Sequence, residues 1–174
     1  MNSAEPILQP SSEENWPEGI RAALQGPVLN IHRMMAHSPE LLRQSAPLRN
    51  YLVAGSTLTG RQRELLILRT AHLIGSEYEW SHHVVRGQAA GLTPEEIERV
   101  KEGARAAGWN MTEKALLRLA DEMRTAQEIT TSTAAQLHED IGPAALIDAI
   151  FTVGFYLTLG TILKSFNVPI DETT

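Results

Sequence analysis

The sequence predicts an all-α fold, a helical domain of about seven or eight helices that forms oligomers. Apolar residues recur at intervals of three and four, helix-start signals precede such runs, and β-branched residues nowhere alternate with polar ones for long. The chain of 174 residues, 43% of them hydrophobic, can bury the core of one domain. We therefore expect a flexible N-terminal arm over residues 1–17, rich in Pro, Ser and Glu, and a single all-α domain over residues 18–174.

Glycine and proline bound the helices expected in the first half of the chain. Ser38-Pro39 supplies an N-cap and a first helical residue, while Pro47 should kink or split the following helix before Gly55 ends it. Thr59–Gln62 has the spacing of a capping box, and the helix after it is apolar around most of its circumference. The expected helices cover residues 17–25, 28–37, 39–55 and 63–74.

The second half has clearer capping signals. Gly75 ends one helix, Ser76 begins the next, and Gly91 closes that one in the position where a left-handed residue is common. Thr93–Glu96 combines an N-cap, a proline at the first helical position and a capping-box glutamate, which makes it the strongest helix start in the chain. The expected helices cover residues 77–90, 94–107, 113–127, 131–142 and 143–166.

The composition argues against several functional classes. The net charge is −6 and the Lys and Arg residues are interspersed, whereas a nucleic-acid surface needs a clustered basic patch. There is no cysteine, which excludes disulfides, thiolate nucleophiles and Cys-ligated zinc. The N-terminal residues lack the charged and apolar regions of a secretory signal, so we expect a cytoplasmic protein with no nucleic-acid partner.

The last expected helix contains the longest uncharged run, residues 149–163. This run is shorter than the roughly 18–20 residues that a spanning helix needs, so we expect a buried or interface helix and no membrane partner. Gly154 and Gly160 would allow another helix to approach closely. The pattern favours packing against a second subunit, in a homo-oligomer that we expect to be a dimer, trimer or hexamer.

Residues 75–83, GSEYEWSHH, have two interpretations. In the first, Ser76 caps a helix and Glu79 reaches back to the Ser76 backbone N–H, which needs no function. In the second, the segment belongs to an active site, because Ser76, Glu79, His83 and Arg86 form one polar stripe along the helix. A helix cap does not require His83.

Glu64 lies on a helix face whose other members are apolar, and a buried carboxylate is costly unless it is paired. The turn at Gly75-Ser76 would fold two helices back to back and bring Glu64 toward His83, as an acid–base pair walled by Tyr78 and Trp80. The alternative is a structural salt bridge to one of three arginines, Arg61, Arg63 or Arg86.

One segment, Glu79–His82, could indicate a metal site, because it has the Glu-x-x-His form used in di-iron bundles. Because the chain has only one such unit and its other histidines follow no ligand spacing, we expect no metal. Nothing resembles a P-loop, a dinucleotide fingerprint or a nucleophile elbow, and no cofactor is expected.

The run from Arg63 to Val100 resembles the carboxymuconolactone decarboxylase and alkylhydroperoxidase D superfamily. The signature of that superfamily is Glu, eleven residues, Cys-x-x-Cys, three residues, His, and Glu64, Ser76, Glu79 and His83 keep this spacing in full. The resemblance implies an all-α fold and oligomers with sites near subunit contacts. Ser76 and Glu79 replace the two cysteines, so peroxide reduction through a thiolate is disfavoured.

Glu64 and His83 keep the residue types of the superfamily signature, and Glu79 adds a second carboxylate. This set resembles the decarboxylase and lyase side of the superfamily. The resemblance implies a cofactor-independent decarboxylase, or a related lyase or isomerase, acting on a small organic acid or lactone. In this hypothesis His83 is the general acid/base, Glu64 orients it and Glu79 tunes it or relays its proton. Four residues would contact the substrate: Tyr78, Trp80, His82 and Arg86, the last through a substrate carboxylate. The alternative is a non-catalytic oligomeric protein that binds a small molecule.

Overall fold

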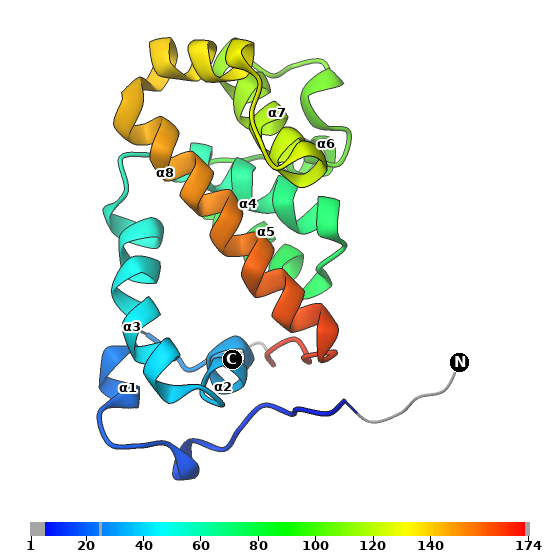
Figure 1. Ribbon diagram of the computed structural model, residues 1–174. Helices are drawn as coiled ribbons and strands as arrows, with labels where there is room; N and C mark the ends of the chain where they lie inside the picture. Colours follow the sequence, from blue (N-terminus) through cyan, green and yellow to red (C-terminus); the bar gives the residue numbers. More distant parts are fainter. Residues whose placement is uncertain (1–5, 25, 173–174) are drawn as a thin grey trace. The chain divides into compact units, whose positions relative to one another are not determined.

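The computed structural model describes residues 6–24 and 26–172, and in these residues all regular secondary structure is helical, with no strand (Figure 1). The all-α prediction is confirmed. The α-helices are α1 (Ile20–Ala23), α2 (Asn30–Met35), α3 (Pro39–Asn50), α4 (Gly60–Ile74), α5 (Glu77–Ala89), α6 (Pro94–Val100), α7 (Met111–Ala126) and α8 (Thr131–Ser165). Three shorter helical segments are η1 (Glu13–Asn15), η2 (Tyr51–Gly55) and η3 (Gly103–Arg105).

The chain divides into two compact units, one formed by the residues up to Gly55 together with those from Thr161 on, and one formed by Ser56–Gly160. In the first unit, α1, α2 and α3 surround a small core of buried apolar side chains, namely Ile20, Leu24, Ala36 and Leu42. Pro47 was expected to kink or split this helix; it lies inside α3 without splitting it.

The predicted flexible arm, residues 1–17, falls partly outside the described residues. Within the described part, Ser11 donates its backbone N–H and its hydroxyl to the Arg33 carbonyl oxygen, at 3.2 and 2.8 Å. Trp16 donates its indole N–H to the Ser11 hydroxyl, and Glu13 forms an ion pair with Arg33 at 2.6 Å. These contacts tie residues 11–16 to α2.

The second unit has two cores that meet at α4. The first core packs α4 and α7 against α8 through buried residues, namely Leu58, Leu66, Ala115, Leu116, Leu119, Ala120, Leu137, Ala145, Ala149 and Val153. The second core packs α4 and α7 against the region from α6 to η3 through Leu65, Leu68, Leu92, Ile97, Val100, Ala106, Trp109 and Leu117. Because α4 supplies both cores, it is buried on most sides, as its sequence predicts.

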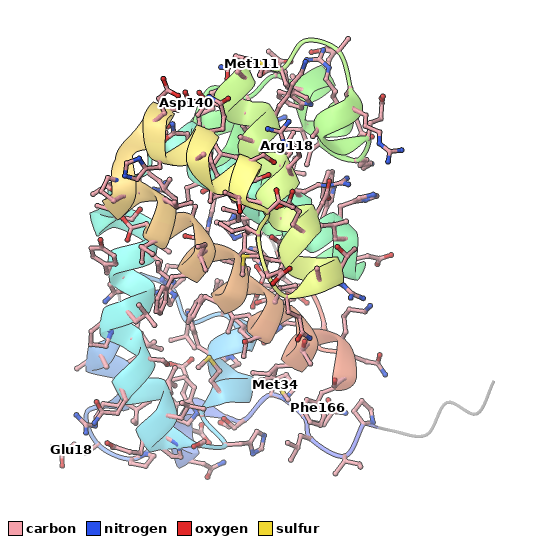
Figure 2. All side chains as sticks on the ribbon, turned by 45° about the horizontal axis from the view of Figure 1, so that its top comes forward. Glu18, Met34, Met111, Arg118, Asp140 and Phe166 are labelled. Atoms are coloured by element: carbon pink, nitrogen blue, oxygen red, sulfur yellow. The ribbon has the colours of Figure 1, made fainter. Side chains whose placement is uncertain are left out.

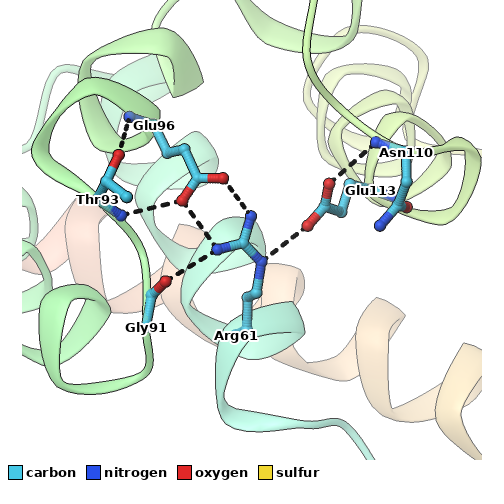
Figure 3. Close-up of polar contacts among 6 residues, drawn as sticks. All are labelled: Arg61, Gly91, Thr93, Glu96, Asn110 and Glu113. Carbon is cyan, nitrogen blue, oxygen red and sulfur yellow. Dashed lines mark hydrogen bonds and ion pairs between the residues drawn. The ribbon is translucent and has the colours of Figure 1, made fainter.

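Arg61 joins the first turns of three helices (Figure 3). Its guanidinium binds the Glu96 carboxylate at 2.6 and 2.9 Å and Glu113 at 2.8 Å. Glu96 and Glu113 also complete capping boxes with Thr93 and Asn110. The hydrogen bonds from Arg61 hold the pKa of Glu96 at about 2. The start of α4 is therefore fixed to the starts of α6 and α7.

Several helices differ from the prediction at their ends, α6 and α7 among them. The helix expected over 94–107 stops at Val100, because Arg69 donates to the carbonyls of Val100 and Lys101 at 3.0 and 2.8 Å and Gly103 takes a φ of +73° beside the same guanidinium. α7 begins at Met111 with Asn110 as its cap, not at Thr112.

α8 contains a non-helical residue, Gly142 (φ +79°), where the two helices expected over 131–142 and 143–166 meet. Figure 2 shows Met111 and Asp140 at one end of this unit, where the Thr112 hydroxyl donates to Asp140 at 2.8 Å. Among the described residues, α8 is long and apolar enough to cross a membrane, judged by length and composition alone. Of its most apolar stretch of 18 residues, 44% is buried inside the protein. Such a result is weak evidence, since core helices pass the same test, and Asp148 lies within the helix, buried and bonded to Thr57.

The two glycines of α8 have different surroundings. A Cβ at Gly160 would collide with Ile74 Cδ1 and lie 3.7 Å from Ser76 Cβ, whereas a Cβ at Gly154 would meet nothing within 4 Å. Gly160 is therefore explained by close packing on the turn between α4 and α5 of the same chain. The sequence had suggested that this glycine serves a subunit contact.

Candidate functional site

The turn between α4 and α5 positions the candidate site. Gly75 has φ +63°, a left-handed conformation that glycine adopts readily, and its N–H donates to His72 O at 3.0 Å. The Ser76 N–H donates to Ala71 O at 2.9 Å, and the Ser76 hydroxyl accepts from the Glu79 N–H at 3.4 Å. α5 thus returns along α4 and brings its inner face to Glu64.

Glu64, Glu79 and His83 meet around one imidazole ring, and we refer to them as the acid–imidazole cluster. His83 Nδ1 lies 2.6 Å from Glu64 Oε2, and His83 Nε2 lies 3.5 Å from Glu79 Oε2. Arg63 Nε lies 3.4 Å from the other oxygen of Glu64. The structure therefore contains both predicted partners of Glu64, the imidazole and an arginine, and the imidazole contact is the shorter.

The acid–imidazole cluster is almost completely shielded from water. The exposed fractions are 2% for His83, 3% for Glu64 and 4% for Glu79. Burial lowers the pKa of His83 below its ordinary value, with Arg86 and His82 adding to the effect, while the hydrogen bond to Glu64 acts in the opposite direction. A neutral imidazole has one N–H and one lone pair, so it can both donate and accept a proton.

The capping box expected from Ser76 and Glu79 is only half formed. The Ser76 hydroxyl accepts the Glu79 N–H as predicted, but the Ser76 N–H donates to the Ala71 carbonyl of the preceding helix. The Glu79 carboxylate points to His83 Nε2, one helical turn further on. Glu79 therefore takes part in the helix cap through its backbone N–H and places its carboxylate in the acid–imidazole cluster.

Tyr156 of α8 is the neighbour that sequence reasoning missed. Its ring meets the His83 ring edge to face, with centroids 5.0 Å apart and planes at 90°, and its exposed fraction is 5%. The sequence pointed to this residue only weakly, as a tyrosine within the uncharged run 149–163. That signal says nothing about which residue, more than seventy positions earlier, the ring contacts.

The four predicted substrate contacts lie in different places. Tyr78 is buried, and its ring contacts that of His82 with centroids 4.7 Å apart and planes tilted by 40°. Arg86 is half-buried, one turn beyond His82, and close enough to lower the pKa of His83. Trp80 contacts the second core, lies under Lys101 at 4.9 Å and meets His72 edge on. The structure thus gives Trp80 a packing environment, and the wall beside His83 is Tyr156.

Among the described residues, no group of three or more His, Cys, Asp or Glu side chains meets the geometry for holding a metal ion. Of the remaining histidines in this unit, His138 is exposed, and the pKa of His72 is lowered by burial and by Arg69. The acid–imidazole cluster is therefore the candidate functional site.

The sequence matches the model of the carboxymuconolactone decarboxylase family over residues 39–122, which include all three members of the cluster. No curated protein matches significantly. Similar solved structures are an uncharacterized peroxidase-related protein from Silicibacter sp. TM1040 (17% identity, 98% of this chain and 96% of that chain covered, TM-score 0.80) and the debrominase Bmp8 with 2,3,4-tribromopyrrole (15%, 98% and 94%, TM-score 0.79). A third, from Agrobacterium tumefaciens, has a name that links it to antioxidant defence (AhpD; 20%, 80% and 96%, TM-score 0.72). These structures share the fold.

Proposed function

We propose that the chain is an acid–base enzyme of the carboxymuconolactone decarboxylase type that acts through Glu64, His83 and Glu79; the match of residues 39–122 to that family's model supports this proposal. The proposed reaction is a cofactor-independent decarboxylation, or a related lyase or isomerase step, on a small organic acid or lactone. The supporting observation is the single imidazole placed between two carboxylates, with Nδ1 2.6 Å from one and Nε2 3.5 Å from the other.

Each residue has one role in this proposal. Glu64 fixes the ring by accepting from Nδ1–H, which leaves Nε2 as the reactive nitrogen. His83 and Glu79 together give a proton to the carbon that loses carbon dioxide, or remove one next to a carbonyl in an isomerisation. Arg86, half-buried beside His82, is the residue that would bind a substrate carboxylate.

The size of the substrate follows from the burial of the site. Side chains that are 2–4% exposed admit only a small molecule, and only after nearby groups move. The debrominase with the same fold was crystallised with a tribrominated pyrrole, which is also a small organic molecule. We propose a substrate of similar size that carries a carboxylate or a lactone carbonyl.

The same burial favours one alternative, a non-catalytic protein that binds a small molecule on this fold. Such a protein would retain the cluster as a buried structural network and would bind ligands without turning them over. Peroxide reduction of the alkylhydroperoxidase type remains disfavoured, because Ser76 and Glu79 stand where that branch has its two cysteines and neither cycles through a sulfenic acid.

The test is turnover of a panel of small carboxylic acids and lactones, followed by carbon dioxide release and by loss of substrate. Wild type and His138→Gln, an exposed histidine of the same unit, should turn over the same compound at the same rate. His83→Gln should lose at least about 100-fold, the typical contribution of a general acid or base. Binding of a panel member by wild type without turnover would favour the binding protein, and full activity in a folded His83→Gln variant would refute the assignment.

A further inference from the structure

The His83 ring faces two carboxylates, and a neutral imidazole can donate to only one of them. Nδ1 is within 2.6 Å of Glu64 Oε2 and Nε2 within 3.5 Å of Glu79 Oε2. If both carboxylates were ionised and the ring neutral, the lone pair of one nitrogen would point at a negative oxygen. The three side chains are 2–4% exposed, so water would screen this repulsion only weakly.

We propose that the resting acid–imidazole cluster holds two protons, one in each of its two contacts, and is therefore a proton donor before any substrate binds. The count of two includes the one proton of a neutral imidazole. This inference deepens the proposed function and rests on it only for the use of the proton in catalysis. The resting cluster then carries a net charge of −1, where the fully deprotonated carboxyls would give −2.

Three arrangements have this proton count, and the surroundings favour one. The ring can be doubly protonated between two carboxylates, or neutral with either Glu64 or Glu79 protonated. Burial, the largest effect on the pKa of His83, disfavours the doubly protonated ring, and the charge of Arg86 adds to this effect, while the hydrogen bond and the charge of Glu64 act in the opposite direction. Arg63 Nε lies 3.4 Å from Glu64 Oε1 and places a positive charge beside that carboxyl.

The favoured arrangement has Nδ1–H donating to ionised Glu64 and a proton on Glu79 directed at Nε2. Tyr156, the group that faces the ring from α8, contacts it edge to face, and this restrains the ring in the plane where both nitrogens meet their carboxylates.

The second proton balances the proposed decarboxylation. When the carbon–carbon bond to the leaving carboxylate breaks, its electron pair stays on the substrate carbon, and the proton from Glu79 forms the new carbon–hydrogen bond, directly or through Nε2. Glu79 is left as a carboxylate, and solvent restores its proton after product leaves. A neutral Glu79 also repels an incoming substrate carboxylate less than an ionised one does.

The test is NMR of substrate-free protein at neutral pH, with ¹⁵N-labelled histidine and ¹³C-labelled glutamate carboxyls, the His83 signals being assigned by their loss in His83→Gln. Wild type should show either one protonated carboxyl in the cluster or two protonated nitrogens on His83. Glu79→Gln should show a single N–H on His83, at Nδ1, and an ionised Glu64. Glu77→Gln, an exposed residue in the same helical turn, should match wild type.

Ionised Glu64 and Glu79 beside a singly protonated His83 in wild type would overturn the inference, whatever Glu79→Gln does. Because no substrate is present, the outcome is separate from that of the turnover test. Turnover lost in His83→Gln, together with a cluster holding one proton, would leave the proposed function standing and refute the two-proton state.

Discussion

His83 is held from three sides by side chains of three helices. Glu79 lies four residues earlier on α5, so helix geometry alone places it on the same face. Glu64 approaches from α4 and Tyr156 from α8, and each fixes a different degree of freedom of the ring. In the proposed tautomer Glu64 accepts the Nδ1–H of His83, and the edge-to-face contact with Tyr156 favours one plane of the ring. The directional control of the proton therefore depends on residues that are far apart in the sequence.

Tyr156 is thus expected to be a positioning residue. Tyr156→Leu should lower kcat about 2- to 10-fold, the equivalent of an aromatic pair worth about 0.5–1.5 kcal/mol, because the ring is freed to rotate. Tyr156→Phe keeps the edge-to-face contact and should keep most of the rate. The pH profile of kcat should move in Tyr156→Leu and stay in place in Tyr156→Phe. Equal losses in both folded variants would contradict the positioning role.

The members of the candidate site could be predicted to different degrees. Glu79 and His83 share a helix face by spacing, and Glu64 faces them because a Gly-Ser turn makes two helices antiparallel, so local rules suffice for these three. Tyr156 follows no local rule. Trp80 was expected beside the cluster, but aromatic character alone did not reveal that its ring packs on the second core and under Lys101.

At the scale of elements, α8 packs against the turn between α4 and α5 at Gly160. A Cβ at Gly160 would collide with Ile74, while a Cβ at Gly154 on the same helix would meet open space. The same turn sets the path of α5 and therefore the distance between Glu64 and His83. Packing at Gly160 is thus connected to the geometry of the acid–imidazole cluster through residues 74–76.

Gly160→Ala should therefore have a free energy of unfolding about 0.5–1.5 kcal/mol below that of Gly154→Ala, because Ile74 must leave its present rotamer. Gly154→Ala is the matched control and should raise it by about 0.5–1 kcal/mol, because alanine is favoured over glycine within a helix. Urea unfolding of both variants measures the difference. A Gly160→Ala variant as stable as Gly154→Ala would show that α8 does not pack closely on the turn.

The starts of α4, α6 and α7 are connected by Arg61, and this contact depends on pH. The pKa of Glu96 is lowered from 4.5 to about 2, so between these values the unfolded chain binds a proton that the folded chain does not. The stabilisation is therefore present above pH 4.5 and is lost as the pH falls toward 2.

Glu96→Gln should lower the free energy of unfolding by about 1–2 kcal/mol at pH 7. This is the value of a charge-assisted hydrogen bond, reduced because the pair is partly exposed to water. The difference from wild type should shrink steadily as the pH falls from 4.5 to 2. Chemical unfolding at several pH values measures it. Glu95→Gln, at the adjacent exposed position, should change stability less at pH 7. If the difference in unfolding free energy between wild type and Glu96→Gln did not change with pH, the ion pair between Arg61 and Glu96 would be contradicted.

For the whole molecule, the sequence was sufficient for the fold class because apolar residues recur at helical spacing and four successive helices, α4 to α7, begin with side-chain caps, as at Thr59 and Thr93. The end of α6 was missed because it depends on Arg69, a residue of another helix. The chain also divides into two compact units, with Thr161 onward joining the N-terminal residues, and the continuous apolar sequence of α8 shows no boundary at that point.

We propose that a second copy of the chain covers the outer face of α8. Ile147 and Phe151, one helical turn apart, are both 54% exposed although they are large and apolar. Wild type should sediment as an oligomer, and the double variant Ile147→Glu, Phe151→Glu should sediment as a single chain. Sedimentation of wild type as a single chain would contradict this proposal.

The central claim is that Glu64, His83 and Glu79 move a proton to or from a substrate carbon. The most direct measurement is deuterium incorporation from D₂O into the product of the compound that wild type turns over, detected by NMR. One deuterium should enter at the carbon that lost the carboxylate, and Glu64→Gln and His83→Gln should slow its entry together with turnover, while His138→Gln should not. Turnover that leaves no solvent deuterium on the product carbon, or incorporation at the wild-type rate in His83→Gln, would contradict the claim.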